Sequence, residues 1–112
     1  MTGEKRMSKF YKIVVYVPAA DAGKIRKLLG ELGAGKIGNY DFASFSVKGT
    51  GRFRPLEGAH PTLGKVGQIE EVEEERIETV VAEEFLPRVL QELRFCHPYE
   101  EPVIDVYALE SM

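Results

Sequence analysis

A strand-type pattern followed by a helix-type pattern occurs twice along this chain, and this duplication limits the fold more than any other feature. Residues 9–18 (KFYKIVVYVP) alternate, are rich in Val, Ile and Tyr, and end at a proline that cannot donate to a sheet, so they predict a strand. Asp21 then suits a helix N-cap, and Gly33 and Gly35 supply a stop signal. Between them, apolar residues recur at helical spacing and predict a first helix: Ile25, Leu28, Leu29 and Leu32.

The rest of the chain repeats this pattern and adds two strands, one before the repeat and one after it. Residues 40–47 (YDFASFSV) alternate and predict a second strand, and residues 69–81 predict a third because their end is β-branched. A second helix is predicted to begin near Pro87, since proline is tolerated in a first turn. Its apolar stripe consists of Phe85, Leu86, Val89, Leu90 and Leu93. Residues 103–109 (VIDVYAL) predict the closing strand.

The order β-α-β-β-α-β is that of the ferredoxin-like α+β fold, a four-stranded antiparallel sheet with two helices on one face. In this topology the strands lie side by side in the order 4-1-3-2. The length of 112 residues predicts a single domain over residues 1–112, with residues 1–8 as an N-terminal tail. A compact chain of this length should have a radius of gyration of about 13 Å.

The two halves of the chain carry opposite charge. Residues 1–67 contain 12 Lys and Arg against 5 Asp and Glu (+7), and residues 68–112 contain 3 against 13 (−10), which gives the net charge of −3. Six of the nine residues from 70 to 78 are Glu, and the predicted strand order brings them near basic residues of neighbouring strands: Lys9, Lys12 and Lys48. We therefore favour cross-strand ion pairs over a nucleic-acid surface, while a cation or partner surface stays open.

Residues 49–67 (GTGRFRPLEGAHPTLGKVG) contain five glycines and two prolines, and they predict a long loop. Loops of more than about 12–15 residues are usually functional or disordered. Arginines on a glycine-rich backbone are typical of sites for phosphate or carboxylate, so Arg52 and Arg54 are candidate ligand-binding residues. The glycines fit neither the phosphate-binding pattern G-x-x-x-x-G-K-[ST] nor the pattern G-x-G-x-x-G that opens a helix. The alternative is a mobile hairpin whose arginines contact another subunit.

A short corner between two prolines, residues 96–102 (CHPYEEP), concentrates the remaining reactive side chains. Candidate ligand-binding residues there are His97, Tyr99, Glu100 and Glu101. A divalent metal ion could be held by His97, Cys96 and, from the loop, His60, although the spacing is not that of a structural zinc site. The simpler interpretation is that Tyr99 anchors the corner and His97 is hydrogen-bonded structure. No catalytic residue is assigned, because Cys96 lies near a helix C-terminus, which does not activate a thiol.

The composition limits the remaining classes. One cysteine excludes an intramolecular disulfide, and no apolar run approaches the roughly 20 residues that a membrane helix needs. The N-terminal residues lack a signal-peptide pattern. We expect a cytoplasmic protein that binds neither membrane nor nucleic acid.

Two motifs of this chain resemble the domain inserted within proteins of the Nif-three-like (Ngg-one-interacting factor three) family. They are residues 49–55 (GTGRFRP) and residues 97–107 (HPYEEPVIDVY), and the residues between them that share the likeness are Gly58, Pro61, Gly64, Gly67, Glu71 and 75–78. The His-Pro-Tyr-Glu corner also resembles CutA, the divalent-cation tolerance family. Both resemblances imply a CutA/PII-like, ferredoxin-like domain that assembles as a homotrimer. The likeness runs from about residue 11 to residue 109.

In full-length Nif-three-like proteins, two flanking halves carry a dinuclear metal centre, and this chain is expected to contain only the insert. A cyclohydrolase or hydrolase activity is therefore not expected to pass to it. PII relatives bind small ligands between subunits near the loop joining strands two and three, which again implies Arg52, Arg54 and the corner at His97. We expect a non-enzymatic trimer that binds a small anionic ligand or ion, or regulates a partner. The alternatives are a CutA-like divalent-metal protein and an enzyme acting on a phosphorylated metabolite.

Overall fold

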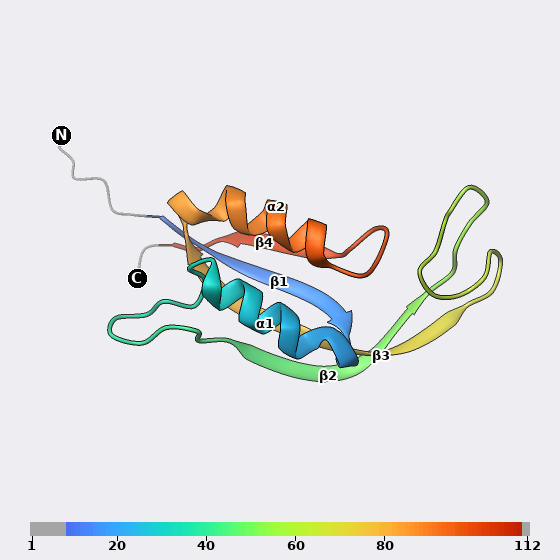
Figure 1. The fold of residues 1–112 in the computed structure, drawn as a ribbon, viewed down its shortest axis with the longest axis horizontal. Helices are drawn as coiled ribbons and strands as arrows, with labels where there is room; N and C mark the ends of the chain where they lie inside the picture. Colours follow the sequence, from blue (N-terminus) through green and yellow to red (C-terminus); the bar gives the residue numbers. More distant parts are fainter. Residues whose placement is uncertain (1–8, 111–112) are drawn as a thin grey trace.

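The computed structural model describes residues 9–110. These residues form the four strands and two helices in the expected order (Figure 1). The elements are β1 (Phe10–Pro18), α1 (Ala22–Glu31), β2 (Phe45–Phe53), β3 (Glu70–Ala82), α2 (Leu86–Cys96) and β4 (Ile104–Ala108), and a 3-10 turn precedes each helix: η1 (Ala19–Asp21) and η2 (Glu83–Phe85). The fold is the predicted ferredoxin-like α+β arrangement.

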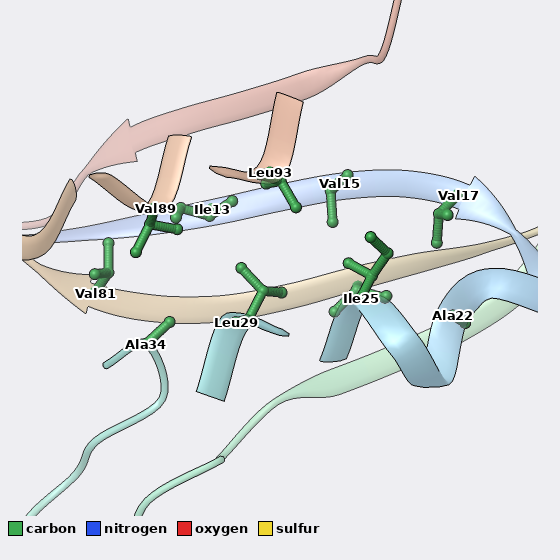
Figure 2. Close-up of a cluster of buried hydrophobic side chains, with 11 residues drawn as sticks. Ile13, Val15, Val17, Ala22, Ile25, Leu29, Ala34, Val81, Val89 and Leu93 are labelled. Atoms are coloured by element: carbon green, nitrogen blue, oxygen red, sulfur yellow. The ribbon is translucent and has the colours of Figure 1, made fainter. Parts of the chain in front are cut away.

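The sheet has the order β2-β3-β1-β4, which is the predicted order. All neighbouring strands are antiparallel, and Ile13 at the middle of β1 lies opposite Thr79 of β3 and Val106 of β4. The core lies between one face of this sheet and the two helices (Figure 2). Alternate residues of β1, Ile13, Val15 and Val17, point to that side, because successive side chains of a strand face opposite ways.

Each helix buries part of the stripe that its spacing predicts, whereas Phe85, expected in the second stripe, lies in η2 and is 44% exposed. Ile25 and Leu29 of α1 and Val89 and Leu93 of α2 are almost fully buried against β1 and β3 (Figure 2). Burial of each such side chain is worth roughly 1.5–3 kcal/mol before the entropic cost of ordering the chain. Asp21 occupies the N-cap position of α1, as predicted, although its side chain makes no capping hydrogen bond.

The boundaries of the second strand and of the loop after it were predicted wrongly. β2 begins at Phe45 rather than at residue 40, and it continues to Phe53, so residues 49–53 of the predicted loop are a strand. The reason is the ladder with β3, in which Gly49 pairs with Glu74 and Gly51 with Val72. This long-range pairing outweighs the poor strand propensity of glycine. The connection to β3 is therefore residues 54–69, which we call the hairpin loop.

The hairpin of β2 and β3 makes the molecule elongated. The radius of gyration is 16.3 Å, against about 13 Å for a compact chain of this length, and the principal extents are 56 × 27 × 21 Å. Figure 1 shows the far ends of β2 and β3 projecting beyond both helices, with the hairpin loop at the tip. Large apolar side chains are exposed on this projection: Leu56, Val66 and Ile69. Phe45 and Val47 are also exposed, but they lie opposite Glu78 and Arg76, where β2 runs beside the body of the sheet.

Candidate functional site

A cavity of about 310 Å³ lies beside the hairpin loop, between the β2–β3 hairpin and the corner that follows α2. Five of the six residues that the sequence suggested as ligand-binding line it: Arg52, Arg54, Tyr99, Glu100 and Glu101. The other lining residues are Tyr16, Gly51, Phe53, Pro55, Ala59, Pro61, Leu63, Glu74 and Val103. The fold thus brings the basic segment and the acidic corner to one site, although about 45 residues separate them in the chain.

The hairpin loop is folded back onto the corner by specific hydrogen bonds. The backbone N–H of His60 donates to Glu100 Oε1 at 3.0 Å, and the Thr62 hydroxyl donates to the Pro98 carbonyl at 2.7 Å. The Gly67 N–H donates to the Pro55 carbonyl at 2.8 Å, which closes the loop on itself. The loop is therefore an anchored wall of the cavity.

Glu74 and Tyr99 form the polar centre of the cavity. The Tyr99 hydroxyl donates to Glu74 Oε2 at 2.8 Å, and the Glu74 residue is only 9% exposed. Burial raises the pKa of Tyr99 well above its usual range, and the hydrogen bond to Glu74 and the negative charge of Glu74 add smaller increases. The phenol therefore stays protonated and remains a donor. The ring of Phe53 packs edge-on against that of Tyr99, with 5.8 Å between centroids.

Gly51 makes room for this arrangement. A Cβ atom at Gly51 would overlap the carboxylate of Glu74, so the absence of a side chain lets Glu74 lie flat over β2. Sequence reasoning did not single out Glu74, because it lies in a run of six glutamates that resembles a solvated strand. The only signal was Gly51, which lies diagonally across the hairpin from Glu74, and that signal requires the register of β2 and β3 to be known.

His97 holds the corner and does not line the cavity. Its Nε2 lies 2.7 Å from the Tyr16 carbonyl, and its Nδ1 accepts the backbone N–H of Tyr99 at 3.0 Å. These two partners require the neutral tautomer with the proton on Nε2. His97 is buried, and its ring lies 5.2 Å from that of Tyr99. His97 is thus hydrogen-bonded structure and Tyr99 anchors the corner, as in the simpler interpretation.

The structure does not bring the three suggested metal ligands together. Within residues 9–110, no group of three or more His, Cys, Asp and Glu side chains is placed to hold a metal ion. Both ring nitrogens of His97 are already engaged, and His60 contacts the corner through its backbone rather than its ring. Cys96 is a free thiol at the last residue of α2. Cys96, His97 and His60 are therefore not assembled as a ligand set within residues 9–110, and a metal site made of them stays a prediction.

Ion pairs explain much of the uneven charge. Lys12 of β1 pairs with Glu78 at 3.5 Å, and Arg76 pairs with the same carboxylate at 3.0 Å. The buried Glu75 pairs with Arg26 of α1. At the cavity, Arg52 Nε lies 2.9 Å from Glu71 Oε2, and both side chains are largely exposed. Of the three lysines that we expected to face the glutamate run, the structure shows only Lys12 in an ion pair within residues 9–110. The other pairs with the run are made by arginines: Arg26, Arg52 and Arg76.

The described residues also bear on the class of protein. No helix between residues 9 and 110 is long and apolar enough to cross a membrane.

Comparison with known sequences identifies relatives that are much longer than this chain. No family model matches it. A Halalkalibacterium halodurans protein named GTP cyclohydrolase 1 type 2 homolog is 48% identical over 101 residues, which is 90% of this chain and 27% of that protein. The Bacillus subtilis protein of the same name is 43% identical over 100 residues, 89% of this chain and 27% of that protein. The chain thus spans about a quarter of the length of these relatives.

Solved structures give the same result for the fold. A Bacillus cereus protein described as related to NIF3 superposes with a TM-score of 0.83 at 42% identity, over 97% of this chain and 28% of that chain. CutA of Archaeoglobus fulgidus, described as a periplasmic divalent cation tolerance protein, superposes with a TM-score of 0.64 at 23% identity. It is matched over 95% of this chain and 87% of its own, and at that identity it shows the fold alone. By sequence and fold, this chain corresponds to a CutA-like segment of the longer Nif-three-like proteins.

Proposed function

We propose that this chain is a non-enzymatic, cytoplasmic module that assembles as a trimer and holds a small anionic ligand in the cavity beside the hairpin loop. The observation that carries the proposal is the projecting hairpin, which both exposes apolar side chains and forms a wall of that cavity. The cyclohydrolase name of the relatives belongs to proteins more than three times as long. We propose that any such activity resides in the part of those proteins that this chain does not span.

The surface of the hairpin supports assembly. Phe45 and Val47 alternate with Ser46, whose hydroxyl accepts from Arg26 of α1, so the two apolar residues face the helix-free side of the sheet. Ile69, the last residue of the hairpin loop, is 70% exposed. The outer edge of β2 is unpaired within residues 9–110, and an unpaired edge beside apolar side chains favours association. The trimer, rather than another symmetric assembly, is the expectation carried by the resemblance to CutA.

The lining of the cavity supports an anionic ligand. Arg54 makes no ion pair with any residue between 9 and 110, so its guanidinium is free to bind a carboxylate or phosphate. Phe53 and Tyr99 offer apolar surface to the body of such a ligand, and the Tyr99 hydroxyl is committed to Glu74. Because the Glu100 and Glu101 carboxylates also line the cavity, the ligand is expected to approach from the arginine side.

Paired variants test the assembly. Ile69→Glu and Val47→Glu place a charge on the proposed interface, whereas Phe95→Glu places one on α2, at a residue that is 85% exposed. Light scattering after size exclusion should report monomers for the first two variants and a trimer for the wild type and Phe95→Glu. A wild type that is already monomeric at micromolar concentration would refute the proposal, as would trimers of both hairpin variants.

Calorimetric titration tests the ligand. Inorganic phosphate, citrate and a mononucleotide serve as anionic probes, and zinc and copper ions serve as probes of the metal alternative. Arg54→Ala should weaken the binding of an anion about tenfold or more, which corresponds to the loss of about 1.4 kcal/mol. Lys65→Ala, in the same loop but outside the lining, is the matched control and should bind as the wild type does. Binding of a metal but of no anion would replace this proposal with the metal-binding one.

A further inference from the structure

The two ends of the described chain meet at one point. The Leu109 N–H donates to the Phe10 carbonyl at 3.0 Å, and Tyr11 pairs with Ala108 in the ladder of β1 and β4. Figure 1 shows this end of the sheet opposite the hairpin loop. A longer protein that contains this domain must therefore enter and leave it at this end, remote from the cavity.

The loop that joins α1 to β2, residues 32–44, lies at the same end of the molecule (Figure 1). The Gly35 N–H donates to the Val80 carbonyl at 2.7 Å, and Val80 lies opposite Lys12, two residues from Phe10. This loop exposes three large apolar side chains: Ile37 (55%), Tyr40 (78%) and Phe42 (50%). We call these three residues the apolar tip.

The apolar tip is held in one conformation. Ile37 and Tyr40 exchange both of their backbone hydrogen bonds, at 2.8 and 2.9 Å. The Ala43 carbonyl accepts the Thr79 hydroxyl at 2.8 Å, which ties the loop to β3. Phe42 adopts a left-handed conformation with a φ of 57°, which is unfavourable for an aromatic residue. Its ring lies over Gly30 of α1, where a Cβ atom would overlap it.

This combination is unusual for a free surface. A loop that is tied down at both ends and strained at Phe42 nevertheless presents its apolar side chains to solvent. Ordered apolar residues on a surface are typical of a protein interface, since the partner gains their burial without having to order them. Ile37 of the apolar tip lines a hollow together with Phe45, so the tip adjoins the helix-free surface on which the proposed trimer depends.

We propose that the apolar tip docks onto the part of the longer Nif-three-like proteins that this chain does not span. About three quarters of each relative lies outside the matched segment, and both connections to it start beside the tip. The docked surface is expected to be apolar at its centre, with polar groups around it. Such docking would fix the orientation of this domain relative to the rest of the protein, and it does not require the cavity to be occupied.

A chimera tests this inference. Residues 9–110 of this chain replace the matched segment of the Halalkalibacterium relative, and hydrogen exchange is compared between the chimera and the isolated chain. Amides of residues 37–42 should exchange about tenfold more slowly in the chimera, while those of the hairpin loop, as the internal control, should be unchanged. Equal exchange of residues 37–42 in a folded chimera would overturn the inference.

Photo-crosslinking identifies what covers the tip. A benzophenone side chain replaces Tyr40 in the chimera, and the control replaces Leu56, which is 63% exposed at the other end. Products that join position 40 to the flanking part of the relative, and are absent from position 56, support the inference. Products that join only two copies of this domain refute it. If the chimera does not fold, the same probe at the aligned position of the natural relative gives the same decision.

Discussion

Removal of the Tyr99 hydroxyl is the most informative single perturbation of the cavity. In Tyr99→Phe, Glu74 loses its 2.8 Å hydrogen bond while its carboxylate stays nearly buried. Hydrogen bonds to charged groups stabilise a protein by about 1.5–3 kcal/mol. Because Tyr99 is only partly buried, water in the cavity can donate to Glu74 in the variant and recover part of the lost stabilisation. We expect the free energy of unfolding to fall by about 2 kcal/mol.

Urea denaturation at a fixed chain concentration measures this change, since assembly makes stability depend on concentration. Tyr40→Phe is the matched control, because the Tyr40 residue is 78% exposed, and it should change the free energy by less than about 0.5 kcal/mol. A Tyr99→Phe protein as stable as that control would show that the contact with Glu74 contributes nothing, and the account of the cavity would fail.

The pH dependence of the same variant provides an independent check. The pKa of Tyr99 is raised in the folded protein above its value in the unfolded chain, about 10. The contribution of the Tyr99 hydroxyl to the stability of the fold is therefore complete below pH 10. It is lost as the pH rises beyond that value, because the phenol loses its proton in the unfolded chain before it does so in the folded protein. The stability difference between the wild type and Tyr99→Phe should shrink from pH 9 to pH 11; a difference that grows over this range would contradict the assigned donor.

Two other contacts give further predictions. Gly51→Ala would displace the Glu74 carboxylate, and it should lower the free energy of unfolding by about 1–3 kcal/mol in urea denaturation. Gly49→Ala is the control, because the position has open space around it, and it should lower the free energy by less than about 0.5 kcal/mol. Arg26→Met leaves the buried Glu75 without its partner and should cost about 2 kcal/mol by calorimetry, a figure reduced because Arg26 is partly exposed. Glu75→Gln in that background should restore part of the loss, and no restoration would argue against the ion pair.

The sequence was sufficient for the layout of the fold. The stripes of α1 and α2 and the alternation of β1 have clear periods that identify the core face of each element, although Val14 on the other face of β1 is buried as well. β2 was placed too early because Gly49 and Gly51 have poor strand propensity, and only pairing with β3 makes them a strand. This error is a tertiary contact overriding a local preference.

The candidate site could be predicted only in part. Arg52, Arg54 and the corner were suggested by their chemistry, and the fold places them around one cavity. Glu74 was missed because a glutamate among glutamates gives no local signal. His97 has the chemistry of a ligand, but its partner, the Tyr16 carbonyl, is 81 residues away in the chain, so its structural role depends on the fold.

The native mass of the wild-type chain tests the central claim most directly. Sedimentation equilibrium at micromolar concentration should give about 38 kDa, three times the chain mass of 12.6 kDa. A single species of 12.6 kDa over that range would contradict the claim, because the projecting hairpin would then expose its apolar side chains in the stable state of the protein.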